Sequence, residues 1–347
     1  MRGALGWKVL GLALAVGLVF AVIDTGMAQS QELRGESQLL FEVARQDLIG
    51  ERVAALREEI DARLRGAGIA FTGLDDVSGT VEVRVSDASN IVKAKDTLAD
   101  LLAPIRVAEG TEPVAELAVD EPEPGLLRYT LTEASIDRRV GLAVEQSLKI
   151  MERRALAIGI DRPVVEKRGP DRIIVIAGGL HDPGQLRDIL SRRARLTLQW
   201  VDESVPVEDA LKGNVPAGSS ILKGTGDPSL QFLVRNDVVL SGDNIVEAQA
   251  IVDQFSGAPA ITFRFDDEGK RVFAEATERN VGHAFAIVLD GEVIMAPTIL
   301  EPILGGTGQI SGNFTKESAS DLALLLRAGG LPAKLNLIEA RFTPVDP

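Results

Sequence analysis

The feature that most constrains the fold of this chain is residues 281–333, in which three local structures follow one another. Residues 285–289 and residues 292–299 are both rich in strand formers, and Asp290–Gly291 lies between them. Asp-Gly between two such runs is the strongest short signal for a β-hairpin, because both turn residues need a positive φ. The sequence therefore predicts a hairpin that turns at Asp290–Gly291.

A glycine-rich loop and a helix complete this stretch. The loop is residues 305–308, and Thr315 stands where a helix N-cap is expected. Gly329 and Pro332 mark the end of the helix, because glycine stops a helix and proline prevents its resumption. The apolar positions of the helix recur at helical spacing and are Ala319, Leu322, Ala323 and Leu326. We interpret the whole stretch as a unit that packs and binds, without a catalytic pattern.

Composition excludes several classes of function. The chain has 347 residues, enough for two or three domains with their own cores. It has no cysteine, so a disulfide framework, a thiol nucleophile and a thiolate zinc site are all excluded. Its formal net charge is −14, which disfavours sequence-independent binding of nucleic acid.

The N-terminus has the pattern of a targeting segment. Arg2 and Lys8 precede an apolar run of roughly 15 residues, which is short for a membrane-spanning helix of about 20. Gly26 and Ala28 supply small residues before Gln29, as in a signal-peptide cleavage site. We therefore expect residues 1–28 to be a signal peptide or, alternatively, an uncleaved N-terminal anchor. Either role would place the rest of the chain outside the cytoplasm, either soluble or tethered by one helix.

Residues 33–203 contain two successive patterns of strands and helices. The first, residues 33–108, predicts a β-α-β-β-α series that awaits a last strand, and the second, residues 126–203, predicts a full βαββαβ series. Between them, residues 109–125 are acidic and proline-rich and predict an exposed linker. The predicted strands are 38–43, 69–74, 80–85, 126–131, 163–167, 172–176 and 195–201, and the predicted helices are 46–65, a second one capped by Ser86 or Asp87, 135–158 and a short one capped by Asp182.

The βαββαβ order is that of the ferredoxin-like plan, so we predict an α+β fold with two such units in tandem. The segment at residues 202–228 is rich in Pro, Gly and Ser and predicts a domain boundary. A third part follows, residues 230–333, and a last strand follows in residues 334–342. Within the third part the sequence predicts strand 231–235, a turn at 236–237, helix 245–255, strand 260–265 and helix 267–280.

Several motifs together resemble the SecD family, specifically its large first extracytoplasmic domain. The resemblance covers residues 33–342 nearly throughout, with its motifs in the family's order. The motifs are LRGESQL at 33–39, the segment from Arg153-Arg154 to Val165, residues 169–183, residues 194–202, VLDG at 288–291, GQISGNF at 308–314 and residues 322–329.

The resemblance implies a ferredoxin-like base, formed by the two units, and a smaller α+β head at residues 230–333. It implies that the head contacts a translocating, unfolded polypeptide, with SecF and the SecYEG channel as possible partners. The family continues into membrane helices that carry a proton path, whereas this chain ends at Pro347. We therefore expect a SecD-like module for protein export without its own proton-conducting part. The alternative is a stand-alone periplasmic polypeptide-binding or chaperone-like protein derived from SecD.

The sequence offers no catalytic constellation. His181 and His283 are the only histidines, no serine lies in a nucleophile elbow, and the turn explains Asp290. We expect no enzymatic activity, no cofactor, no metal site, no small-molecule substrate and no nucleic-acid partner. The candidate polypeptide-binding residues are apolar or flexible positions on and beyond the hairpin: Met295, Ile299, Leu300, Ile303, Leu304, Gly305 and Gly306.

Overall fold

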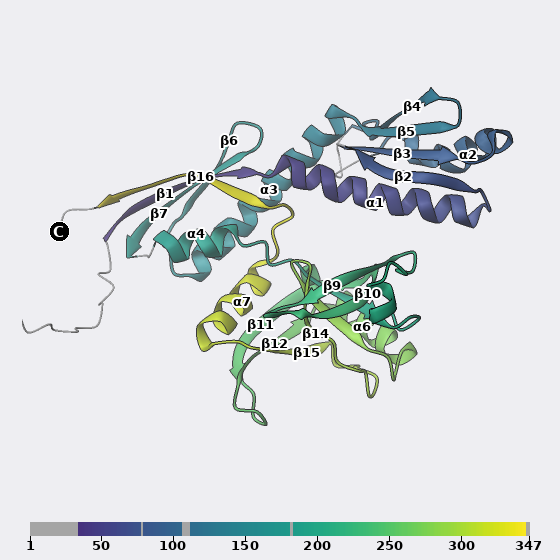
Figure 1. Ribbon diagram of the computed structural model, residues 1–347. Helices are drawn as coiled ribbons and strands as arrows, with labels where there is room; N and C mark the ends of the chain where they lie inside the picture. The colour runs from purple at the N-terminus through teal and green to yellow at the C-terminus, as the bar shows by residue number, and fades with distance from the viewer. Residues whose placement is uncertain (1–33, 78, 106–111, 181–182, 345–347) are drawn as a thin grey trace, which may run out of the picture. The chain divides into compact units, whose positions relative to one another are not determined.

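The computed structural model describes residues 34–77, 79–105, 112–180 and 183–344, and this part of the chain has the expected α+β fold (Figure 1). The predicted signal peptide or anchor at residues 1–28 lies outside the described residues, as does the predicted cap Asp182. Among the described helices, none is both long enough and apolar enough to cross a membrane.

One sheet of the base collects strands that are far apart in the sequence. Its order is β16-β1-β7-β6, with every neighbouring pair antiparallel. Counted along the chain this is fourth, first, third, second, with one helix before the second strand and one after the third. That is the ferredoxin-like arrangement. Its elements are β1 (Arg34–Val43), α3 (Glu133–Ala157), β6 (Val164–Arg168), β7 (Arg172–Leu180), α4 (Pro183–Ser191) and β16 (Leu335–Pro344).

The second base sheet has the order β2-β3-β5-β4. The helix α1 packs against β2 and β3, and α2 packs against α1. Side chains beneath both base sheets join one apolar core, which includes Phe41 of the first sheet and Val83 of the second. The elements of this part are α1 (Arg45–Gly66), β2 (Phe71–Val77), β3 (Thr80–Val85), α2 (Ile91–Leu98) between two short 3-10 turns (Ala88–Asn90 and Ala99–Leu102), β4 (Leu117–Glu123) and β5 (Leu126–Leu131).

The predicted tandem of units is therefore wrong, although its elements are present. β1, expected in the first unit, pairs with β7 and β16, and β5, expected to begin the second unit, pairs with β3. The chain leaves the ferredoxin-like sheet after β1, builds the second sheet, and returns through α3. Strands that alternate in the same way and have similar compositions do not indicate which strands they pair with. Sequence order was therefore a poor guide to pairing.

The predicted acidic linker also needs correction. Most of its second half is β4, an edge strand that pairs with β5. Beyond Leu117, every residue of β4 is exposed. Charged side chains and a proline suit an edge strand, because they discourage pairing with another chain. The acidic, proline-rich composition therefore reflects an exposed sheet edge.

The head consists of a closed five-stranded barrel and a three-stranded sheet. The barrel order is β10-β8-β13-β14-β9, and the sheet order is β11-β12-β15. Helices α6 and α7 pack on β12, and α7 also packs on β11. The elements are β8 (Leu196–Val201), α5 (Val207–Ala210), β9 (Ser219–Gly224), β10 (Asp227–Ser241), a 3-10 turn (Gly242–Asn244), β11 (Ile245–Val252), β12 (Pro259–Phe265), α6 (Asp267–Arg279), β13 (Phe285–Leu289), β14 (Glu292–Met295), β15 (Thr307–Ser311) and α7 (Lys316–Ala328).

Three head predictions differ from the structure. β8, expected to close the second base unit, pairs with β10 and β13 of the barrel instead. The turn expected at residues 236–237 lies inside β10, where the register with β8 shifts. The helix expected at 245–255 is the strand β11, paired with β12. Long-range pairing overrides local pattern in each case.

Within residues 281–333, the predicted hairpin turn and the predicted helix are confirmed. Asp290 and Gly291 have φ values of 53° and 88°, as the predicted turn requires. Thr315 accepts a hydrogen bond from the Ser318 N–H, and the Ser318 hydroxyl bonds back to the Thr315 N–H. Gly329 follows the helix with a φ of 99°. The glycine-rich loop is shorter than expected, because β15 begins at Thr307.

Candidate functional site

The predicted binding residues are Met295, the last residue of β14, and positions on the segment that joins β14 to β15. The backbone of this segment is tied to α6 and to the residues after it. The Ile303 N–H donates to Thr277 Oγ1 at 3.0 Å, and the Gly282 N–H donates to the Ile299 carbonyl at 2.8 Å. Because Thr277 is buried on α6, the segment between β14 and β15 is held against the head rather than extended into solvent.

Only part of the predicted set is accessible. Leu300 is 84% exposed and Leu304 is 63% exposed, whereas Ile299 is only 4% exposed. Met295 and Ile303 are partly buried against the apolar core of the head. Gly305 is exposed, and Gly306 is buried where a Cβ atom would lie 2.6 Å from Lys270 Cβ. The accessible apolar site is therefore Leu300 and Leu304, and their role in binding stays a prediction.

Sequence reasoning missed Phe255, which is 100% exposed. It lies in the turn between β11 and β12, a position hidden by the wrong helix prediction. The Asp253 carboxylate accepts hydrogen bonds from Gln309 Nε2 and from the backbone N–H groups of Phe255 and Ser256. These hydrogen bonds lower the pKa of Asp253 to about 2, and the bond from Gln309 has the largest effect. The phenylalanine is thus presented by a hydrogen-bonded turn.

Two chain crossings join base and head, one at residues 192–195 and one at 329–332. They lie side by side, since the Leu331 N–H donates to the Arg193 carbonyl at 2.8 Å. Arg154 of α3, which has no exposed surface, fastens both. Its guanidinium donates to the carbonyls of Ile189, Arg192 and Gly329 at 2.9, 2.5 and 2.8 Å.

Desolvation lowers the pKa of Arg154 to about 9, so the side chain remains charged at neutral pH. No carboxylate of the described residues forms an ion pair with it, and carbonyl dipoles solvate the charge instead. Several of these carbonyls lie at the C-terminal end of α4, where the helix dipole favours a cation. Arg154 therefore acts as a capping group for α4 and as a tie to the end of α7.

Two carboxylates, those of Asp290 and Glu51, bind residues of the first crossing, 192–195. Asp290 accepts hydrogen bonds from the Ala194 and Arg195 N–H groups at 3.1 and 2.8 Å. Glu51 of α1 accepts both guanidinium N–H groups of Arg193 at 2.5 and 2.9 Å. The sequence explained Asp290 by its turn alone, and this second role was missed because its partner lies 95 residues away.

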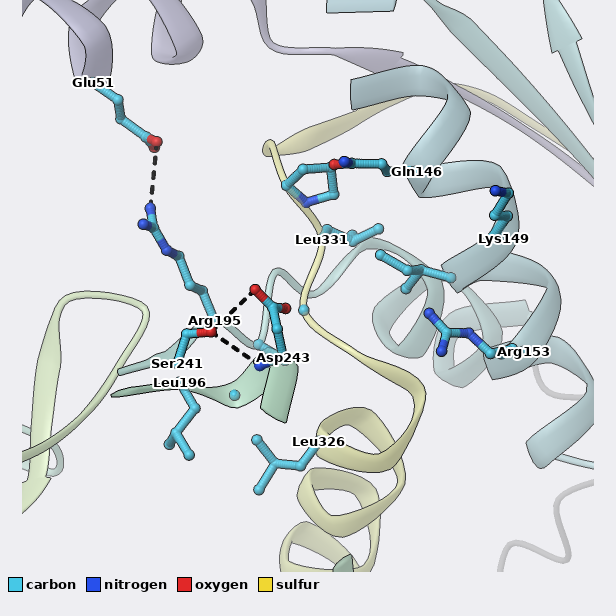
Figure 2. A pocket seen from close by; sticks show the side chains of 15 residues that line it. Glu51, Gln146, Lys149, Arg153, Arg195, Leu196, Ser241, Asp243, Leu326 and Leu331 are labelled. Atoms are coloured by element: carbon cyan, nitrogen blue, oxygen red, sulfur yellow. Dashed lines mark hydrogen bonds and ion pairs between the residues drawn. The ribbon is translucent and has the colours of Figure 1, made fainter. Parts of the chain in front are cut away.

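A cavity of about 510 Å³ lies beside the crossings. Figure 2 shows α3 on one side of it, with Gln146, Lys149 and Arg153, and Ser241 and Asp243 across from them. Leu196 and Leu331 are buried residues of its lining. The cavity thus combines an apolar floor with charged walls.

The rest of the described chain contains little that suggests chemistry. The described residues hold no cluster of three or more His, Asp or Glu side chains that could bind a metal ion. His283 Nδ1 lies 2.8 Å from a Glu203 carboxylate oxygen, and both side chains are exposed. His181 lies outside the described residues.

Comparisons with known proteins agree with the sequence motifs. A family model described as "SecDF, P1 head subdomain" matches residues 219–333, and one described as "Protein translocase subunit SecDF, P1 domain, N-terminal" matches residues 144–203. The chain is 33% identical to the protein translocase subunit SecD of Rickettsia felis over 89% of its own length and 58% of that protein. It is 31% identical to the protein translocase subunit SecD of Calditerrivibrio nitroreducens over 98% of its length and 66% of that protein.

A solved structure of a membrane component SecDF that enhances protein export is 31% identical to this chain. The match covers 65% of this chain and 97% of that one, with a TM-score of 0.47. The chain spans 58% to 66% of the length of the two relatives named above.

Proposed function

Because the chain belongs to the SecD family and matches its P1 region, we propose that it serves protein export outside the cytoplasm by holding segments of the emerging polypeptide. The observation that carries this proposal is the exposed pair Leu300 and Leu304 on a segment whose backbone is fixed to the head. A fixed backbone lowers the entropy lost on binding. The site consists of exposed apolar side chains, which suits clients of many sequences.

We expect the affinity for an unfolded polypeptide to be low, because export requires that the client is released. Full burial of one leucine side chain contributes about 1.5–3 kcal/mol, and ordering each residue of an unfolded client opposes this by about 1–2 kcal/mol. Two leucines therefore support transient contact with an extended segment. Weak contact permits release, so that the client can move on.

A pair of matched double variants tests the polypeptide site. We expect Leu300→Ser with Leu304→Ser to weaken binding of a fluorescently labelled, permanently unfolded polypeptide by about tenfold in an anisotropy titration, since apolar contact area is lost. The control is Leu211→Ser with Leu230→Ser, because these leucines are 51% and 55% exposed elsewhere on the head. Equal losses in both variants would show that exposed leucine in general, and not this site, binds the client.

We propose SecF and the SecYEG channel as partners, because the chain belongs to the SecD family and its relatives are named as subunits of a protein translocase. The experiment is affinity purification of the chain from cells after chemical crosslinking in intact envelopes. We expect SecF and SecY in the eluate, and no such enrichment with an unrelated periplasmic bait. A chain recovered without either subunit, yet still able to bind unfolded polypeptide, would instead support a stand-alone polypeptide-binding protein.

A further inference from the structure

The cavity beside the crossings contains two cationic side chains that the fold does not use. Lys149 and Arg153 of α3 line it, and neither forms an ion pair or hydrogen bond within the described part of the chain. Arg153 lies against the second crossing, since a Cβ atom on Gly329 would be 3.4 Å from its Nη2. Both residues are exposed, so their charges are available to a ligand in a chain whose formal net charge is −14.

The remaining charges of the lining do not cancel these two. Glu51 already binds Arg193 and lies 3.6 Å from Arg195, so its charge is balanced within the protein. Asp243 lies on the opposite wall and accepts a hydrogen bond from the Ser241 hydroxyl at 3.1 Å. The lining thus has three cations, Lys149, Arg153 and Arg195, against the two carboxylates of Glu51 and Asp243.

The apolar residues and the volume of the cavity limit which ligands could bind in it. The lining includes the almost fully buried Ile150, Leu196, Leu326 and Leu331 and the partly exposed Pro332, so a ligand with an apolar part as well as negative charge fits it. A cavity of about 510 Å³ is within the range that holds a drug-sized ligand and is far larger than an inorganic anion needs. An acidic side chain flanked by apolar residues in an extended peptide meets both requirements.

We propose that this cavity binds acidic–apolar segments of the client polypeptide, with Lys149 and Arg153 holding a client carboxylate above the apolar floor (Figure 2). This inference rests on the proposed function and adds a preference to it. The Arg153 guanidinium can donate two parallel hydrogen bonds to a carboxylate, and the Lys149 ammonium supplies a point charge. The contact is separate from Leu300 and Leu304, which do not line the cavity.

The test compares two labelled peptides that differ only in charge. One has glutamate residues among apolar ones, and the other has glutamine at the same positions. We expect the wild-type chain to bind the glutamate peptide about tenfold more tightly at low salt, and the preference to shrink as salt is added. In Lys149→Gln with Arg153→Gln we expect the preference to disappear while the glutamine peptide binds as before.

A second double variant controls for net charge. Lys167→Gln with Lys223→Gln removes two exposed cations that also lack ion pairs in the described residues and lie outside the cavity. We expect it to keep the preference. The proposal is overturned if the cavity variant keeps the preference, if both variants lose it equally, or if the wild type has none. Unchanged binding of the glutamine peptide would then leave the proposed function standing, and failure of both peptides to bind would overturn both.

Discussion

At the scale of single residues, the adjacent pair Arg153 and Arg154 divides two tasks between two neighbouring faces of one helix. Arg154 is buried and ties α3 to the two crossings through backbone carbonyls. Arg153, one position earlier and so about 100° away around the helix, lies on the cavity wall. The sequence identified the pair as part of a family motif, but only the structure separates a structural arginine from one that faces a cavity.

We predict that Arg154→Met destabilises the protein by about 3 kcal/mol, because buried carbonyls of α4 and of Gly329 would lose their charged donor and methionine offers none. The midpoint of chemical denaturation measures this loss. Arg154→Lys should recover part of the stability, since an ammonium group keeps the charge but cannot span both crossings as a guanidinium does.

The control for this prediction is Arg138→Met on the same helix. Arg138 has no hydrogen bond or ion pair in the described part of the chain, so its replacement should change the stability by less than about 0.5 kcal/mol. If Arg154→Met were as stable as Arg138→Met, the hydrogen bonds to the crossings would contribute nothing net, and burial of the charge would have cancelled them.

At the scale of elements, local signals gave correct predictions where the deciding contacts are also local. The Asp290–Gly291 turn and the Thr315 cap depend on residues within a few positions, and both are confirmed. The strand β11 shows the opposite case. Ile245, Ala248 and Ile251 recur at helical spacing, yet β-branched residues are frequent and β12 supplies a partner strand. The β-branched content was the available signal, and the spacing was misleading.

The residues of the candidate site show the same division between local causes and long-range ones. Exposure of Leu300 and Leu304 agreed with the expectation for a loop, because a short polar or glycine-rich segment cannot cover large side chains on its own. Gly306 is covered by Lys270 of α6, and Ile299 shares an apolar cluster with Phe273 of α6, so the burial of both depends on an earlier part of the sequence. Phe255 was missed because the helix wrongly predicted at 245–255 included it, whereas β11 ends at Val252.

At the scale of the whole molecule, the base is built from segments that other parts of the chain interrupt. β1 pairs with β7 more than a hundred residues later and with β16 near the end of the described chain. A sequence can indicate such strands but not their partners, since register and pairing depend on packing against a shared core. The tandem prediction failed for this reason, and the return strand after residue 333 succeeded because a single apolar run followed a clear helix stop.

The position of the head within this order leads to a prediction about folding. The base core uses residues up to Leu190 and again from Leu331, whereas the main head core runs from Leu196 to Leu326. Among the described residues, one small apolar cluster of Ile189, Ala194 and Leu325 contains residues of both parts. Removal of residues 195–330, with a short Gly-Ser linker in their place, should therefore leave a folded base, because the Leu331 N–H already lies 2.8 Å from the Arg193 carbonyl.

The excised base should still unfold in one cooperative transition. Loss of the shared cluster exposes Ile189 and removes the Gly329 acceptor of Arg154, a cost of about 2–3 kcal/mol that corresponds to a fall in Tm of roughly 4–12 °C. The separate head, residues 195–330, should fold as well, since its main core is internal. Calorimetry and the dispersion of amide NMR signals measure both outcomes. A broad transition with collapsed dispersion in the excised base would contradict the separation of cores, and would mean that base and head fold only together.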